Sequence, residues 1–227
     1  MPRLSTVTPP PAGLWRVARG EPFALREPSS PLTGGAADPG IGNRFDSALA
    51  NFRVWYFATE LEGCYGETLA TLRPDPAVVA AIDGEEDCFM PLGQIAADWR
   101  QQRIAVRATF PEKRPFLDVE ASSTRAFLRD RLAWLLASLE LDDIDVAAIR
   151  SKDRRLTRWI AQWVWHSRHE IGFPNFAGIR FRSRLDSDWE CWAVFEDVLP
   201  EELERRSILR QDEALQRVAE LYRLDIF

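Results

Sequence analysis

Charged and hydroxyl side chains interrupt short apolar segments at four widely separated places in this chain. Arg16 lies in L-W-R-V-A, and Arg44 follows a small-residue turn in G-N-R-F-D. Glu67 ends a segment that begins with Y-F-A, and Ser183 lies in I-R-F-R-S-R-L. An arginine or glutamate beside a hydrophobic core is costly unless a partner or a ligand compensates its charge. Two arginines, a glutamate and a serine could together hold an anionic ligand that contains a sugar.

The composition is that of one ordinary domain with a sizeable core. The chain has 227 residues, 46% of them hydrophobic, with nine Trp and thirteen Phe. This length and composition argue against disorder in the middle of the chain. The formal charge of −6 and a pI near 5.1 argue against general binding of nucleic acid or of anionic membranes. A local cluster of arginines can still bind a small phosphorylated ligand.

The cysteines and histidines predict neither disulfides nor a metal site. Cys64, Cys88 and Cys191 are odd in number and lack C-x-x-C spacing, so we expect reduced, buried thiols. His166 and His169 are three residues apart on a predicted helix, but no convincing set of further ligands accompanies them. No segment approaches the roughly 18 apolar residues of a membrane span, and the N-terminus lacks an apolar signal region. We expect a soluble cytoplasmic protein.

The segment pattern predicts an α+β domain with two appendages. Residues 1–12 are Pro-rich and predict a flexible tail, 13–198 form the domain, and 199–227 predict an amphipathic helix that begins at Pro200. Residues 26–43 predict an irregular loop. Within the domain, strands are predicted at 14–19, 52–58, 102–110, 116–119, 178–183 and 189–195, and helices at 60–72, 123–139 and 154–169. The absence of G-x-G-x-x-G and G-x-x-x-x-G-K-[ST] motifs excludes Rossmann and P-loop interpretations.

Five fragments in a fixed order resemble the RES domain family, which is named for its Arg, Glu and Ser. They are W-R-V at 15–17, G-N-R-F-D at 42–46, W-Y-F-A at 55–58, G-E-T-L-A at 66–70 and G-I-R-F-R-S-R-L at 178–185. The segment D-W-E-C-W-A-V-F-E-D at 188–197 extends the match. The resemblance implies a single ADP-ribosyltransferase-like domain with NAD in a cleft between small mixed sheets. It also implies a toxin held inactive by an Xre-family antitoxin.

The resemblance also implies roles for individual residues. Arg16 and Arg44 match the pocket arginines, Tyr56 the aromatic residue near nicotinamide, Glu67 the glutamate and Ser183 the serine. Family members destroy NAD by phosphorolysis or hydrolysis at the nicotinamide ribose, or they ADP-ribosylate a protein. The long middle region at 74–150 and the C-terminal helix depart from the simplest toxins.

This chemistry is consistent with the residue types. A carboxylate such as Glu67 can stabilise the oxocarbenium character that develops when the ribose–nicotinamide bond breaks. The forked donors of Arg16 and Arg44 suit the two phosphates of NAD, and one arginine could hold inorganic phosphate instead. Ser183 can supply one positioned hydrogen bond, and no metal is required.

Each residue also has a simpler explanation. The arginines could pair with internal carboxylates, Glu67 could be solvated, and Tyr56 could belong to the core. Under these explanations the chain is a non-catalytic scaffold that binds a nucleotide or a protein. Cys64 is a poor candidate for a nucleophile because no histidine is near it in the sequence. The basic run that includes Arg154 predicts a solvated helix start, and the C-terminal helix could serve a homo-oligomer, an antitoxin or its own domain.

Overall fold

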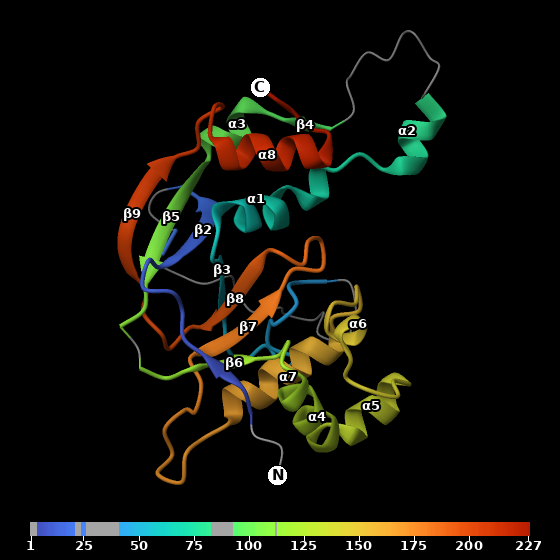
Figure 1. Cartoon of the computed structure of the whole chain (residues 1–227), viewed down its shortest axis with the longest axis vertical. Coiled ribbons are helices and arrows are strands. Elements are labelled where there is room, and N and C mark those ends of the chain that lie inside the picture. The colour runs from blue at the N-terminus through green and yellow to red at the C-terminus, as the bar shows by residue number, and fades with distance from the viewer. Residues whose placement is uncertain (1–3, 21–23, 26–40, 83–92, 112) are drawn as a thin grey trace.

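The computed structural model describes residues 4–20, 24–25, 41–82, 93–111 and 113–227, and its centre is one eight-stranded sheet (Figure 1). The strands lie in the order β1-β6-β7-β8-β3-β2-β5-β9. Their bounds are β1 Thr6–Val7, β2 Leu14–Arg19, β3 Val54–Ala58, β5 Arg103–Thr109, β6 Phe116–Asp118, β7 Gly178–Arg182, β8 Glu190–Phe195 and β9 Glu201–Ser207. Neighbouring strands are antiparallel except β6 and β7, which are parallel. The predicted α+β class is confirmed, with most strands in one large sheet.

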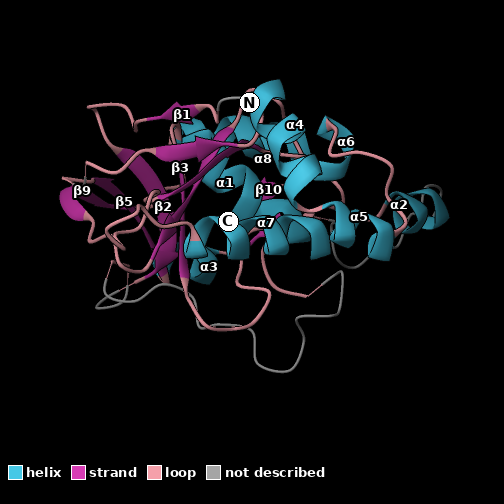
Figure 2. Ribbon diagram, turned by 90° about the horizontal axis from the view of Figure 1, so that it is seen from below, coloured by secondary structure: helices cyan, strands magenta, loops and turns pink. Residues whose placement is uncertain are grey.

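Apart from α2, the helices form two groups beside the two halves of this sheet. Figure 1 shows α1, α3 and α8 next to β2 and β5, and α4 to α7 next to β6 and β7. The bounds are α1 Leu61–Leu69, α2 Pro76–Ile82, α3 Ala97–Gln101, α4 Ser122–Arg131, α5 Ala133–Leu139, α6 Val146–Ile149, α7 Arg155–His166 and α8 Glu213–Tyr222, with a 3-10 turn at Ala70–Leu72. A small parallel sheet joins β4 (Gln94–Ile95) and β10 (Asp225–Ile226). Seen from below, the strands gather on one side of the molecule and most helices on the other (Figure 2).

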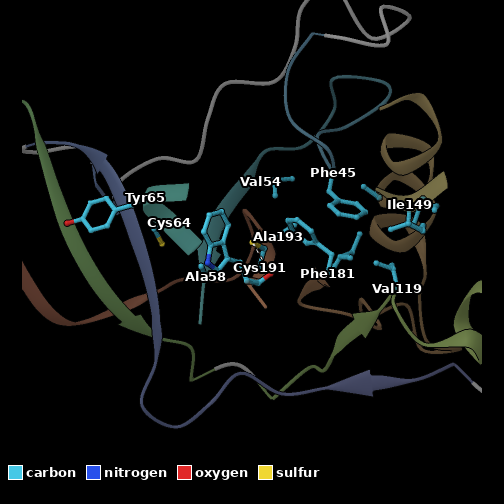
Figure 3. Close-up of a cluster of buried hydrophobic side chains, with 14 of the residues drawn as sticks. Phe45, Val54, Ala58, Cys64, Tyr65, Val119, Ile149, Phe181, Cys191 and Ala193 are labelled. Carbon is cyan, nitrogen blue, oxygen red and sulfur yellow. Dashed lines mark hydrogen bonds between the residues drawn. The ribbon is translucent and has the colours of Figure 1, made fainter. Parts of the chain in front are cut away.

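Alternation along β3 supplies side chains to two hydrophobic cores. Trp55 and Phe57 point to one face, where they join Trp192 of β8. Val54 and Ala58 point to the other face, which α1 and α7 cover. Figure 3 shows part of this second cluster, in which Phe45, Phe181 and Ile149 come together from separate segments. Sequence-distant segments therefore meet around β3.

The sheet is nearly divided between β2 and β3. All six residues of β2 pair with β5, and all five residues of β3 pair with β8. Between the described strands β2 and β3, by contrast, the register holds a single pair, Trp15 with Ala58. The two strands therefore diverge beyond Trp15, and the divergence leaves room for side chains between the two halves of the molecule.

Two predictions at the chain ends are wrong. The segment before residue 13 is not a free tail, because β1 pairs with β6 and the Ser5 N–H donates to Thr124 Oγ1 at 3.0 Å. Residues 201–207 are an edge strand and not the start of a helix, since their backbone pairs with β5. The final helix begins later, where the Asp212 carboxylate accepts from the N–H groups of Ala214 and Leu215.

The predicted helix at 123–139 is divided, and the other predicted elements of the domain are confirmed within a few residues. Leu132 leaves the helical conformation with φ −110° and ψ 21°, so that α4 ends before it and α5 begins after it. Leu128 before the break and Leu136 after it are both buried in the core. No Gly or Pro marks this position, and the sequence therefore gives no signal for it. The predicted loop at 26–43 lies mostly outside the described residues, as does Cys88.

Candidate functional site

A cleft of about 330 Å³ opens beside the divergence of β2 and β3. The predicted residues Arg16, Arg44, Tyr56 and Glu67 line it, together with Arg154 and Arg184. This volume is at the small end of the roughly 300–1,000 Å³ that is usual for ligand pockets. Segments from β2 to β8 thus contribute to one site.

A short hydrogen bond joins Ser183 to Glu67 in this site. Glu67 is exposed on α1, whereas the Ser183 side chain, just after β7, is buried. The Ser183 hydroxyl donates to Glu67 Oε1 at 2.5 Å and accepts from the Leu185 N–H at 3.0 Å. Ser183 therefore lies behind the carboxylate and orients it, while Glu67 itself faces the cleft.

Close packing of α1 fixes the position of Glu67. Gly66 lies against the ring of Trp189, and a Cβ at this position would be 2.0 Å from Trp189 Cζ3. The Tyr222 hydroxyl of α8 also donates to the Gly66 carbonyl at 3.2 Å. The glycine before the glutamate in G-E-T-L-A thus has a packing reason.

Arg44 faces Glu67 from the turn before β3. Its Nη1 donates to the carbonyl of Ile149, and a longer contact of 3.5 Å joins Nη1 to the Ser151 carbonyl. Burial lowers the pKa of Arg44, and the nearby negative charge of Glu67 opposes that shift. The positive charges of Arg154 and Arg184 also act to lower it. These four side chains therefore share one electrostatic environment.

The hydroxyl of Tyr56 forms hydrogen bonds with the turn that carries Arg44. It donates to Asp46 Oδ1 at 2.9 Å and accepts from the Phe45 N–H at 3.0 Å. The other oxygen of Asp46 accepts from the Asn43 N–H at 2.6 Å. Burial, followed by the charge of Asp46, raises the pKa of Tyr56 well above its ordinary value. The sequence fragment contains Asp46, but residue type alone assigned it no role.

Arg16 bridges the divergence between β2 and β3. Its Nη1 donates to the Tyr56 carbonyl at 3.1 Å, and its Nε donates to the Ala24 carbonyl at 3.2 Å. The guanidinium lies 5.7 Å and 5.9 Å from the ring centres of Trp55 and Phe57. Burial lowers its pKa. The contacts are therefore to backbone and aromatic rings, and phosphate binding by Arg16 stays a prediction.

Cys64 lines the cleft as a protonated thiol. Its Sγ donates to the Trp15 carbonyl at 3.0 Å, and burial raises its pKa to about 12. A thiol with this pKa is not a nucleophile near neutral pH. Among the described residues, no group of three or more His, Cys, Asp and Glu side chains could hold a metal ion.

The cleft concentrates positive charge in an acidic chain. Four arginines and one glutamate line it, although the chain as a whole has a formal charge of −6. Arg154 was expected in a solvated helix start, and the structure places it here instead. Arg184 directly follows Ser183 in the sequence, and this adjacency was the available signal that Arg184 belongs to the site. This arrangement favours an anionic ligand.

A larger hollow of about 620 Å³ lies elsewhere, between α1, α8 and β9. Its charges are mixed and already paired, as in Arg206 with Asp212 at 3.2 Å and Arg217 with Glu62. It contains none of the residues predicted for the site. The smaller cleft is therefore the candidate site.

Comparison with known proteins identifies a matching family and a similar solved structure. The model of a family described as "RES domain" matches residues 13–217. One chain of a crystal structure described as the M. tuberculosis MbcT–MbcA toxin–antitoxin complex aligns with a TM-score of 0.45 and 11% identity, covering 97% of this chain and 91% of that chain. No curated protein matches. In the described part of the chain, every helix is too short or too polar to cross a bilayer.

Proposed function

This chain belongs to the RES domain family, and on that premise we propose that it cleaves the ribose–nicotinamide bond of NAD. The observation that carries the proposal is the Glu67 carboxylate, oriented by the Ser183 hydroxyl at 2.5 Å and facing a cleft lined by arginines. The arginines suit the phosphates of NAD, and the carboxylate suits the positive charge that develops on the ribose.

The proposed reaction breaks the bond between the ribose C1″ and the pyridinium nitrogen. The bonding electrons leave with the nitrogen, so that nicotinamide departs neutral and C1″ acquires oxocarbenium character. Glu67 stabilises this positive charge across the cleft, as carboxylates do in glycoside hydrolysis. Inorganic phosphate then adds to C1″ to give ADP-ribose 1″-phosphate, or water adds to give ADP-ribose and a proton.

The other residues of the cleft have supporting roles in this scheme. Arg44 binds a phosphate of NAD or the attacking inorganic phosphate, and Arg154 and Arg184 add positive potential beside it. Ser183 acts through Glu67 and is a positioning residue, because its side chain is buried behind the carboxylate. The ring of Tyr56 lines the cleft where nicotinamide would stack.

We further propose that the chain is the toxin of a toxin–antitoxin pair, with an Xre-family protein as its antitoxin. Membership in the RES domain family supports this proposal. Protein ADP-ribosylation would begin with the same bond cleavage and differ in the acceptor alone.

The first test is nicotinamide release from NAD by purified protein, with and without inorganic phosphate. We expect release in at least one condition. Release that requires phosphate indicates phosphorolysis, and release without phosphate indicates hydrolysis. Transfer of label from NAD to protein would instead indicate ADP-ribosylation. Folded protein that releases no nicotinamide in either condition contradicts the proposed reaction.

The second test removes the charge of Glu67. We expect Glu67→Gln to keep the fold and to lower kcat for nicotinamide release by at least about a hundredfold, the scale of a lost transition-state contact. Glu62→Gln is the matched control, since Glu62 lies on the same helix but pairs with Arg217 outside the cleft. Near-normal turnover in Glu67→Gln would favour the binding scaffold.

A further inference from the structure

Asp46 is a buried carboxylate that the proposed chemistry does not use. Its residue is 8% exposed, and its carboxylate accepts from the Tyr56 hydroxyl, the Asn43 N–H and, at 3.5 Å, the Asn43 side-chain amide. Burying a carboxylate is costly unless hydrogen bonds compensate it, and these donors do so for Asp46. Asp46 lies two residues after Arg44, in the turn that forms one wall of the cleft.

We propose that Asp46, acting through the Tyr56 hydroxyl, is a positioning residue that holds Arg44 toward the cleft. The inference rests on the proposed function, because Arg44 is there the ligand of an NAD phosphate. Asp46 itself does not touch the substrate. Tyr56 contributes its ring to the cleft and its hydroxyl to the turn, and thus connects the two.

The hydrogen bonds hold the backbone on both sides of Arg44. The residue before it, Asn43, donates its N–H to Asp46, and the residue after it, Phe45, donates its N–H to the Tyr56 hydroxyl. The hydroxyl in turn donates to Asp46 at 2.9 Å. One phenol–carboxylate pair therefore holds the Gly42–Asn43 and Arg44–Phe45 peptide units, one on each side of Arg44.

Packing and protonation support the same role. The Phe45 side chain is fully buried, and the centre of its ring lies 4.8 Å from the centre of the Phe181 ring. The core therefore also holds the turn. The raised pKa of Tyr56 keeps its hydroxyl protonated at neutral pH, and it remains a donor to Asp46. Because the hydrogen bonds and the Phe45 ring both hold the turn, its backbone loses less conformational freedom when Arg44 binds an anion.

The test uses calorimetric binding of ADP-ribose, which carries both phosphates of NAD but lacks the bond that would be cleaved. Tyr56→Phe keeps the ring and removes the hydroxyl, and Asp46→Asn keeps the shape and removes the charge. We expect each variant to bind ADP-ribose about tenfold more weakly, the effect of losing one well-placed hydrogen bond. Tyr65→Phe is the matched control, because it removes another tyrosine–aspartate hydrogen bond, Tyr65 to Asp212 at 3.3 Å, outside the cleft.

A double-mutant cycle separates positioning from general stabilisation. In an Arg44→Ala background, Tyr56→Phe should cause no further loss of ADP-ribose affinity, since the residue it positions is gone. An equal loss in both backgrounds would overturn the inference, as would unchanged affinity in both Tyr56→Phe and Asp46→Asn. A folded, fully active Asp46→Ala variant would also overturn the inference.

The outcomes distinguish this inference from the proposed reaction. Wild-type protein that binds ADP-ribose but releases no nicotinamide from NAD contradicts the reaction and leaves the positioning role to be decided by the cycle. Wild-type protein that has no affinity for ADP-ribose overturns the positioning role, because Arg44 then has no such ligand to bind.

Discussion

Ser183 and Glu67 are 116 residues apart in the chain and meet through one hydrogen bond of 2.5 Å. The carboxylate is exposed to the cleft, whereas the hydroxyl is buried and accepts a backbone N–H from Leu185. A serine in this place can orient the carboxylate, because the hydroxyl donates to it. Its importance for the reaction therefore depends on Glu67.

We predict that Ser183→Ala lowers kcat for nicotinamide release by about tenfold and changes KM less, since the loss concerns a transition-state contact. Steady-state kinetics with NAD would check this split. Ser187→Ala, in the neighbouring exposed turn, is the control and should keep wild-type kinetics. A raised KM with unchanged kcat would show instead that Ser183 contacts the substrate directly.

At the residue scale, spacing within the motifs predicted which side chains meet but not how they meet. Arg44 and Glu67 are brought to one cleft as predicted. Arg16 also lines it, but its donors contact the carbonyls of Ala24 and Tyr56, and partners of this kind have no signature in residue type. Arg154 was missed because its place in the cleft depends on where α7 begins in space.

At the scale of elements, the position of α1 depends on a residue without a side chain. Gly66 allows the ring of Trp189 to lie against the helix directly beside Glu67. The strands were predicted well where apolar residues alternate, as in β5. The charged strand β9 was mistaken for a helix, because its side chains are mostly exposed and only its pairing with β5 decides its structure.

We predict that Gly66→Ala destabilises the protein by about 1–3 kcal/mol, the usual cost of forcing extra atoms into a packed region. It should also lower turnover, because the helix must shift at Glu67. Chemical denaturation and nicotinamide release would measure the two effects. Gly20→Ala is a suitable control, since its nearest new contact is the Gln102 carbonyl at 3.6 Å. Equal stability of the two variants would contradict the packing argument.

For the whole molecule, buried thiol and phenol groups limit stability in alkaline solution. Burial raises the pKa of Cys64 from 9.0 to about 12, and that of Tyr222 from 10.0 to about 12. The unfolded chain therefore loses these protons at lower pH than the folded chain does. Their contribution to the free energy of unfolding is complete below about pH 9 and is lost as the pH rises toward about 12.

We predict that the free energy of unfolding of the wild-type protein falls steadily above about pH 9. Denaturant titrations at several pH values would show this slope, and Cys64→Ala should make it shallower by removing one of the contributing groups. A free energy of unfolding that stays constant between about pH 9 and pH 11 would contradict the prediction.

The near-division of the sheet between β2 and β3 has a consequence for synthesis on the ribosome. The two strands are close in sequence, yet each completes its hydrogen bonding with a strand made much later, β2 with β5 and β3 with β8. A nascent chain that ends before residue 190 lacks β8 and Cys191, which lines the cleft. Such long-range pairing also slows folding. The cleft is therefore complete only when nearly the whole polypeptide has been translated.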